Sequence, residues 1–499
     1  MRKAQVTDHE KARLAALLDH LEKLLPDADQ AHAFRAAILT LPLPTARFNP
    51  LITQLAALPD RLASLGQAVA WCPDAFTLNR PHPALGNTLE HLLGGLYIQA
   101  KATTLAVEVL QPQPHERVLD LAAAPGGKTT QIAARMANTG LLVANEPNKK
   151  RMPALVGNLE RCGIFNTVLT QAPGTLLARY FHNYFDRVLL DAPCSGDGII
   201  AKDRAMLGYW SPLDASHKAN QQLGLLRAAF HMLRPGGTLV YSTCSLSVEE
   251  NEEVLAALMR TYPDQFDMQP INALPPTPLP QAIAARYPTT LTHMRRVWPH
   301  LHQTEGACIA KLKKKQQPTL WAQEDGDATT WPAATTQTEA VAAKGTIECQ
   351  WDFSLPSTGD HILINDQRHL HIMPPQGPAF KEHLPFFLKA GMHLTRHHKG
   401  HHYLAHQAIA LWGHTMQRPA LALTWSQTQQ LFAGKDIVLA KPISLKGEVV
   451  CRLGPLTVCR ALVKAEGYAV QGMVPKSTRR QTLNQLSITD ADQISVASD

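Results

Sequence analysis

Two cysteines stand at points of the sequence where a thiol could act as a nucleophile. Cys194 lies in the stretch DAPCSGDG, which Asp191 opens, and Cys244 lies in STCSLSVEE. An apolar run precedes each stretch, so each cysteine is expected to follow a buried strand. A thiolate is a strong nucleophile, and charges near the sulfur decide how readily it forms. We therefore interpret the two stretches as parts of one candidate reaction site.

Methylation of a cytosine at C5 is a chemistry that needs these residue types. C5 is too weak a nucleophile to accept a methyl group directly, but a thiolate that adds to C6 pushes electron density onto C5. C5 can then attack a sulfonium methyl group, after which a base must remove the C5 proton so that the bond to the enzyme can break. Asp191 is placed to assist the addition near N3 and the exocyclic amine.

The residues after Cys244 match a helix start. Ser247 and Glu250 have the S-x-x-E spacing of a capping box, which predicts a helix from Ser247 onward. Partial positive charge at a helix N-terminus favours a nearby thiolate, whereas the glutamates at 249–253 oppose it.

The other cysteines are expected to be buried and unreactive, because a free cysteine packs as a small hydrophobic residue. They are Cys72, Cys162, Cys308, Cys349, Cys451 and Cys459. The eight cysteines contain no CxxC pair, which argues against a zinc ribbon or a disulfide framework. We expect a chain with free thiols and no metal, located in the cytoplasm.

Length and composition indicate an ordinary multidomain globular protein. The 499 residues suggest two to four domains, with 45% hydrophobic and 18% charged residues. No apolar run is long enough for a membrane span, and the N-terminal segment predicts an amphipathic helix rather than a signal peptide. The formal net charge of +7 permits an anionic partner.

The elements that must position the cysteines lie within 106–315, where short apolar runs alternate with helical patterns. This rhythm predicts an α/β domain with a doubly wound parallel sheet, closed by a hairpin near 295–315. Residues 1–105 are predicted to be mainly helical and 316–345 to be a linker. A connecting α+β segment is expected over 346–412, and a smaller α+β or β-barrel module over 413–499.

Three strand ends of this sheet suggest a cofactor pocket, since open α/β sheets bind ligands at the carboxyl ends of their strands. Glu146, an acid of the type that accepts ribose hydroxyls, marks the second of these strand ends, and Asp191 marks the third. The first strand end is followed by a loop of small residues, which are Ala122, Ala123, Ala124, Pro125, Gly126, Gly127 and Lys128. Neither G-x-G-x-x-G nor a P-loop is present, which favours S-adenosylmethionine over NAD or ATP.

Residues 90–315 resemble the Nop/Sun (Fmu) family of S-adenosylmethionine-dependent RNA cytosine-5 methyltransferases, which have a Rossmann-like fold. The motifs that carry the resemblance are GGLYIQA, AAAPGGKTTQIAARM, ANEPNKKR, LLDAPCSGDGII and LRPGGTLVYSTCSLSVEENEEVL. The resemblance implies that Cys244 is the nucleophile, that Cys194 assists release of the product, and that Asp191 lies between cofactor and base. It also implies that residues 122–128 and Glu146 bind the cofactor.

The C-terminal part is similar to the tail of bacterial YebU/RsmF-type members, which carry a PUA-like RNA-binding module and modify small-subunit ribosomal RNA. This similarity implies RNA contacts by the N-terminal segment and by the C-terminal module. Basic residues that could contact phosphates there are Lys464, Lys476, Arg479 and Arg480. The chain departs from the family pattern at Pro173, where an aspartate near the adenine is usual, and at Ala100.

Alternatives remain open at this point. A catalytically silent RNA-binding ribosome assembly factor would keep the same fold, and the same chemistry could act on transfer RNA or, less well matched, on DNA. The histidines at 397–406 could suggest a metal site, but alternation along a strand would point neighbours to opposite faces. They are His397, His398, His401, His402 and His406. The target nucleotide and the oligomeric state are not indicated.

Overall fold

The computed structural model describes residues 8–484 apart from short internal stretches. These are 82–83, 209, 316–329, 332, 336–337, 356–360, 367–368, 399–400, 418–419, 440, 446 and 465–466. Much of the expected linker and the last part of the chain, 485–499, therefore lie outside the described residues. Among the described helices, none combines the length and apolar character that crossing a lipid bilayer requires.

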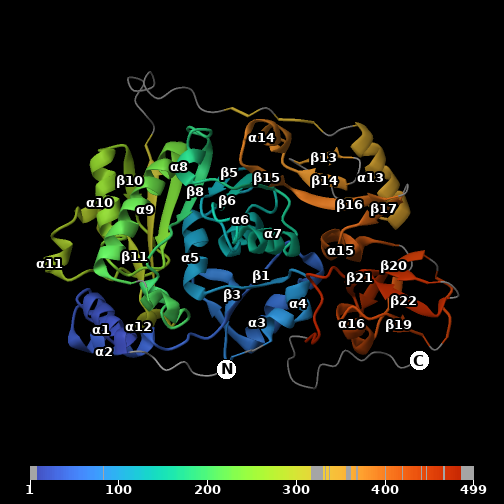
Figure 1. Cartoon of the computed structure of the whole chain (residues 1–499), viewed down its shortest axis with the longest axis horizontal. Coiled ribbons are helices and arrows are strands. Elements are labelled where there is room, and N and C mark those ends of the chain that lie inside the picture. Colours follow the sequence, from blue (N-terminus) through green and yellow to red (C-terminus); the bar gives the residue numbers. More distant parts are fainter. Residues whose placement is uncertain are drawn as a thin grey trace.

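A nine-stranded sheet forms the centre of the molecule (Figure 1). Five neighbouring strands of it are parallel. In spatial order they are β9 (Leu233–Thr243), β8 (Phe185–Asp191), β5 (Arg117–Asp120), β6 (Leu141–Asn145) and β7 (Thr167–Thr170). The structure thus confirms the Rossmann-like sheet that the sequence predicts for 106–315.

Helices cover both faces of this sheet because side chains alternate along each strand. Val118, Leu142 and Leu189 pack with the helices of one face, and their neighbours Leu119, Val143 and Leu190 pack with those of the other. The first face carries α5 (Lys101–Leu110), α6 (Gly127–Arg135) and α7 (Met152–Arg161). The second carries α8 (Gly174–Leu177), α9 (Pro212–Met232) and α10 (Glu252–Thr261).

The expected closing hairpin is confirmed beside β9. Strand β12 (Ala307–Lys314) pairs antiparallel with β9 and with β11 (Arg295–Val297), and the short helix α12 (Pro299–His302) joins the hairpin strands. Strand β10 (Phe266–Gln269) completes this edge, and the helix α11 (Gln281–Ala284) lies in the connection that follows it.

The N-terminal region is helical only in part, which corrects the expectation of a mainly helical segment. Helices α1 (Asp8–Glu22) and α2 (Ala28–Ile38) are followed by an antiparallel sheet in the order β2-β3-β1-β4. Its strands are β1 (Thr45–Phe48), β2 (Gly66–Val69), β3 (Cys72–Leu78) and β4 (Leu96–Ile98), with α3 (Leu58–Leu65) and α4 (Leu89–Leu92) between them. All four residues of β1 are buried, including the polar residues Thr45 and Arg47, so burial does not follow the short polar–apolar alternation of this strand.

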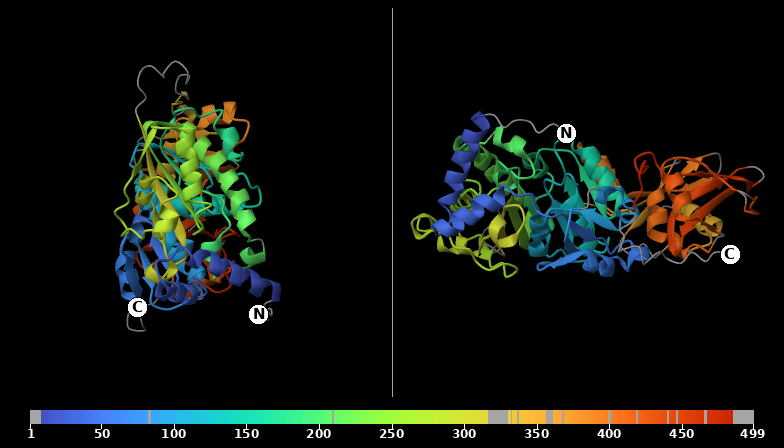
Figure 2. Two further views of the ribbon diagram at one scale, coloured as in Figure 1. Left: turned by 90° about the vertical axis from the view of Figure 1, so that its left-hand side faces the viewer. Right: turned by 90° about the horizontal axis from the view of Figure 1, so that it is seen from below.

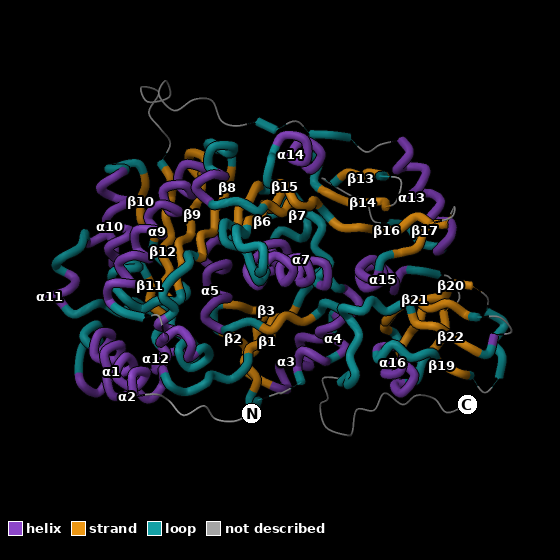
Figure 3. The backbone as a smooth tube through the Cα atoms, in the orientation of Figure 1, coloured by secondary structure: helices purple, strands orange, loops and turns teal. Residues whose placement is uncertain are grey.

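The segment expected to connect the domains also takes part in the central sheet. Strand β15 (Phe387–Ala390) pairs antiparallel with β7 and so extends that sheet by its outer edge (Figure 3). The rest of the segment forms a four-stranded sheet, with helices around it. Its elements are α13 (Thr338–Trp351), β13 (Ile362–Asn365), β14 (His369–Met373), α14 (Gly377–His383), β16 (Met392–His398), β17 (His401–Leu404) and α15 (His406–Trp412). Helix α13 begins inside the expected linker.

The C-terminal module is a five-stranded sheet in the order β18-β20-β21-β22-β19, compatible with the expected PUA-like module. It consists of β18 (Ala420–Ala422), α16 (Trp425–Phe432), β19 (Ile437–Val438), β20 (Gly447–Leu453), β21 (Leu456–Val463) and β22 (Ala469–Gly472). Figure 2 shows this module at one end of the elongated molecule and the helices α1 and α2 at the other.

Candidate active site

The two cysteines of the candidate site meet at one edge of the central sheet. Strands β8 and β9 are parallel neighbours, with Asp191 opposite Ser242, so the loops that follow them leave the sheet side by side. The Sγ atoms of Cys194 and Cys244 lie 2.8 Å apart, and both residues are free and half-buried. The prediction that these cysteines border one site is thus matched by the geometry.

Contact with Cys244 and burial both raise the pKa of the Cys194 thiol well above its usual range. Cys194 therefore keeps its proton at neutral pH, and either sulfur of the pair can act as the hydrogen-bond donor.

A buried carboxylate holds the loop that carries Cys194. The side chain of Glu250 accepts hydrogen bonds from the backbone N–H and the hydroxyl of Ser195, and from Gln222. Gln222 also donates to the carbonyl of Pro193 at 3.0 Å, so both residues that flank Cys194 are fixed. Burial raises the pKa of Glu250.

A second buried carboxylate, Asp197, holds the loop that carries Cys244. It accepts from the backbone N–H of Leu246 at 2.6 Å and from the hydroxyls of Ser245 and Ser247 at 2.8 and 2.5 Å. Gly198 approaches the same loop so closely that a Cβ on it would lie 2.7 Å from the carbonyl oxygen of Cys244.

The predicted helix start at Ser247 is wrong for this reason. The Ser247 hydroxyl is used by Asp197, and the side chain of Asn251 donates to the carbonyls of Ser245 and Ser247. The chain stays irregular through 251, and α10 begins at Glu252. Cys244 therefore lies eight residues before the helix and is not part of its first turn.

Asp191 lies beside the cysteines in a charged and hydrogen-bonded position. Its Oδ2 atom accepts from the Lys128 ammonium and its Oδ1 atom from the Ser242 hydroxyl, each at 2.7 Å. Burial opposes charge on Lys128, but the carboxylate of Asp191 outweighs it and raises the pKa of this lysine. The first and third predicted strand ends are thereby joined through one ion pair.

The loop 122–128 turns directly from β5 into α6. Gly126 has a φ of +106°, a conformation that other residues avoid, and it precedes the first helical residue without any side-chain cap. Glu146 is buried behind the loop, where its carboxylate accepts from the N–H groups of Ala124 at 3.3 Å and Asn148 at 2.8 Å. The structure thus brings residues 122–128, Glu146 and Asp191 together.

Asp120 completes this group from below the loop. It is buried, its Oδ2 atom accepts from Thr129 at 2.7 Å, and burial raises its pKa to about 6. Its Oδ1 atom has no hydrogen-bond partner among the described residues. A buried carboxylate oxygen of this kind suits a ligand that carries a cationic or N–H group.

Comparison with known proteins agrees with this geometry. A profile described as 16S rRNA methyltransferase RsmB/F matches residues 107–313. Ribosomal RNA small subunit methyltransferase F of Erwinia tasmaniensis is 33% identical over 456 residues, which cover 87% of this chain and 91% of that protein. Its namesake from Salmonella agona is 34% identical, with 86% and 89% covered.

The chain belongs to the RsmB/F family of 16S rRNA methyltransferases. It is accordingly an S-adenosylmethionine-dependent RNA methyltransferase, as the resemblance of its motifs implies. A solved methyltransferase homologue from Pyrococcus horikoshii is 30% identical and superimposes with a TM-score of 0.54, covering 62% of this chain and 99% of that one. The Rossmann-like domain is thus shared with a solved structure.

The N-terminal sheet supports the 122–128 loop of this RsmB/F chain, which the sequence did not indicate. Arg47 is buried and donates to Gln99 at 3.1 Å, to the carbonyl of Gly127 at 3.3 Å and to Thr130 at 2.8 Å. Burial lowers the pKa of this guanidinium. Gln99, which precedes the family departure at Ala100, is therefore part of the support for α6.

The N-terminal helices cover the loop that follows Cys244. Leu246 and Val248 pack with α1 and α2 in one apolar cluster, and His20 lies 3.3 Å from Glu249. The hydrogen bond with Glu249 raises the pKa of His20. The N-terminal helices thus contribute to the shape of the site.

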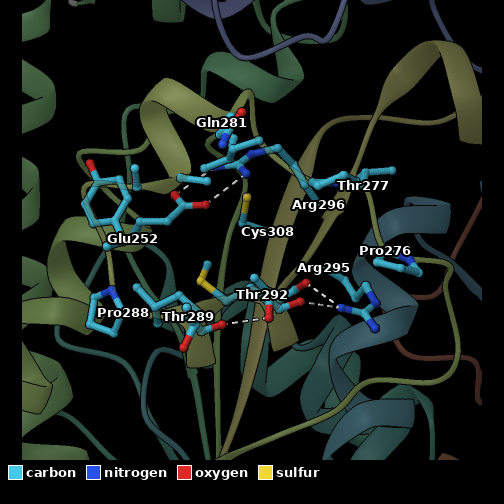
Figure 4. A pocket seen from close by; sticks show the side chains of 17 residues that line it. Glu252, Pro276, Thr277, Gln281, Pro288, Thr289, Thr292, Arg295, Arg296 and Cys308 are labelled. Atoms are coloured by element: carbon cyan, nitrogen blue, oxygen red, sulfur yellow. Dashed lines mark hydrogen bonds and ion pairs between the residues drawn. The ribbon is translucent and has the colours of Figure 1, made fainter.

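A cavity of about 360 Å³ lies behind the Cys244 loop, away from the thiol pair. Figure 4 shows the buried ion pair of Arg296 and Glu252 in its wall, with Cys308 beside it. Its lining includes neither site cysteine nor Asp191, and most of it comes from 276–296. This cavity is therefore separate from the candidate reaction site.

Two remaining expectations concern single residues. Cys349 is exposed, which corrects the prediction that all six other cysteines are buried. At the departure from the family pattern, Pro173 leads into α8, while the preceding Ala172 is bound through its N–H and carbonyl to the side chain of Asn145.

The histidines at 397–406 do not form one group. His397 and His402 face each other across β16 and β17 with ring centroids 4.9 Å apart, whereas His406 is buried in α15. The side chains of His398 and His401 lie outside the described residues.

Proposed function

We propose that this chain transfers a methyl group from S-adenosylmethionine to C5 of a cytosine in small-subunit ribosomal RNA, through a covalent bond between Cys244 and C6. The observation that carries the proposal is the meeting of the Cys194 and Cys244 sulfurs, 2.8 Å apart, at the end of the strand whose Asp191 binds Lys128 of the 122–128 loop. The names of the relatives support ribosomal RNA as the substrate.

In this mechanism the two cysteines act in succession. The thiolate of Cys244 adds to C6, and C5 takes the methyl group. A general base then removes the C5 proton, the electron pair of that bond re-forms the C5–C6 double bond, and the sulfur departs from C6 as a thiolate. Cys194 assists this release from its position beside Cys244. Asp191 accepts a hydrogen bond from the exocyclic amine and, in its protonated form, donates to N3, with Lys128 and Ser242 fixing the orientation of its carboxyl group.

The cofactor is held by residues 122–128, Glu146 and Asp191, and it supplies the electrophilic methyl group when bound. The uncapped first turn of α6 offers N–H groups, and the buried Oδ1 of Asp120 suits its amino group. The target base reaches this pocket only when it is extruded from its stack.

RNA binding is assigned to the N-terminal segment and to the C-terminal module. Lys476 is exposed there and available for phosphate contacts. Lys464 instead pairs with Asp436, and Arg479 and Arg480 donate to backbone carbonyls. We expect the enzyme to act in the cytoplasm.

Methyl transfer from labelled S-adenosylmethionine to small-subunit ribosomal RNA lacking the mark tests this function. Stable label at C5 of one cytosine is expected, and transfer RNA tested in parallel should remain unlabelled. If the folded chain binds cofactor and RNA but labels neither, the proposal fails in favour of a catalytically silent assembly factor.

A further inference from the structure

A group of histidines outside the candidate active site lies on the sheet formed by β13, β14, β16 and β17. His369 and His371 project from the same face of β14, because Leu370 and Ile372 between and after them are buried in the core. Asp366 stands at the turn that leads into this strand, where its carboxylate accepts from the N–H of His369 at 2.8 Å.

Three side chains converge at this turn. One ligand atom each from Asp366, His369 and His371 lies within 4.8 Å of the others. His371 Nε2 is 2.9 Å from Asp366 Oδ2, and His369 Nδ1 is 3.6 Å from Asp366 Oδ1. His393 faces them from β16, with its ring centroid 4.3 Å from that of His371 and 4.5 Å from that of His369.

We propose that Asp366, His369 and His371 bind a divalent transition metal ion of the zinc class, with His393 as the neighbouring fourth group. Two imidazoles and a carboxylate are ligands that zinc, copper and nickel accept. Ligands at 2.0–2.1 Å from a tetrahedral ion lie about 3.3 Å apart. The 2.9 and 3.6 Å separations end on different oxygens of Asp366, and all three ligand atoms lie within 4.8 Å of one another, so the side chains must rotate to bring one oxygen and both nitrogens to this spacing.

The surroundings of these histidines bear on the binding of a cation. Nδ1 of His371 is buried without a hydrogen-bond partner among the described residues. The nearby Lys389 opposes a cation, but it is paired with Glu160.

Such an ion would fasten the turn between β13 and β14 to strand β14. The next strand of the chain, β15, extends the central sheet, so the ion would stabilise the part of the molecule that joins the methyltransferase domain to the C-terminal module. This site departs from the sequence expectation of a chain without metal, and it is distinct from the histidines at 397–406.

Zinc titration of the full-length chain, purified without a histidine tag, tests the proposal. The background carries Cys194→Ser and Cys244→Ser, so that the thiol pair does not take up the ion. Isothermal titration should show one saturable site, and zinc should raise the melting temperature. His371→Ala should weaken binding at least tenfold, and Asp366→Asn, a conservative change at an exposed residue, should weaken it as well.

His402→Ala is the matched control, because this histidine lies on β17 of the same sheet and faces His397 instead. It should bind zinc as the parent does. Absence of saturable binding overturns the proposal, as does unchanged affinity in both His371→Ala and Asp366→Asn. If His402→Ala weakens zinc binding while His371→Ala and Asp366→Asn bind normally, the ion binds near His402, and the proposal is likewise overturned. Melting temperatures in chelator establish that each variant is folded.

Discussion

Two pairs of neighbouring cysteines in the described part of the chain share their proximity and the raised pKa of one thiol but differ in their surroundings. Cys451 and Cys459 are opposite each other on β20 and β21, fully buried among apolar residues. Contact with Cys451 and burial raise the pKa of Cys459. Cys194 and Cys244 are half-buried, on loops held by carboxylates and next to an ion pair. Proximity alone therefore does not mark a reactive thiol, whereas access and charged surroundings do.

The largest effect is expected for removal of one sulfur from each pair. Cys244→Ala should lower methyl transfer at least about 10³-fold, because no other group can form the bond to C6. Cys451→Ala should leave the rate per folded molecule unchanged and cost about 1 kcal/mol of stability through lost packing. Rates and thermal unfolding of both variants check this. A comparable loss of methyl-transfer rate in Cys244→Ala and Cys451→Ala would contradict the difference between the two cysteine pairs.

The loop supports should give the next effect. In Glu250→Gln one accepting oxygen becomes an NH2 group and the charge is lost, so at least one of the hydrogen bonds that Glu250 accepts from Ser195 and Gln222 must reverse or break. The resulting shift of Cys194 should lower kcat about ten- to a hundredfold. Glu253→Gln is the matched control, since that side chain is 43% exposed and lies outside this network. A normal kcat in Glu250→Gln would show that the loop is held by other contacts.

Alkylation of the native chain distinguishes the two pairs by access. Iodoacetamide followed by mass spectrometry should modify the exposed Cys349 first and the site pair next, with Cys451 and Cys459 protected until unfolding. S-adenosylmethionine should slow the reaction at Cys244 and leave Cys349 unaffected. Early modification of Cys451 would contradict its described burial.

The last effect is on stability rather than on rate, and it concerns the carboxyl of Asp120 beneath the 122–128 loop. Burial raises the pKa of Asp120 from 3.8 to about 6, so its folded form favours the proton. The resulting stability is fully present below pH 3.8 and is lost as the pH rises through about 6, by on the order of 3 kcal/mol. Asp120→Asn should lack this decline. Denaturant unfolding at pH 4 to 7 compares the two, and parallel curves would refute the assignment.

Much of the methyltransferase domain is readable from the sequence because its five parallel strands are apolar runs followed by turn residues. The site cysteines, Asp191 and Glu146 are predictable for the same reason, since they mark strand ends. The N-terminal sheet is not, because strand β1 has only four residues and its polar residues Thr45 and Arg47 are buried rather than exposed.

The supports of the site were also beyond sequence reasoning. Asp197 takes the hydroxyl of Ser247 from fifty positions away, and no local pattern reveals that a capping box will be overridden in this way. Glu250 has the spacing of that capping box, but its side chain instead holds the loop that carries Cys194. No sequence motif marks Arg47, and only its buried position against α6 shows that it supports this helix.

Trapping of the covalent intermediate tests the central assignment most directly. Cys194→Ala should bond to target RNA through Cys244 and, lacking the group that assists release, should persist as an adduct on denaturing gels. The double variant with Cys244→Ala should form none, and peptide mapping should place the nucleotide on Cys244. Normal turnover without an adduct in Cys194→Ala, or an adduct on any other residue, would contradict the assignment of the two thiols.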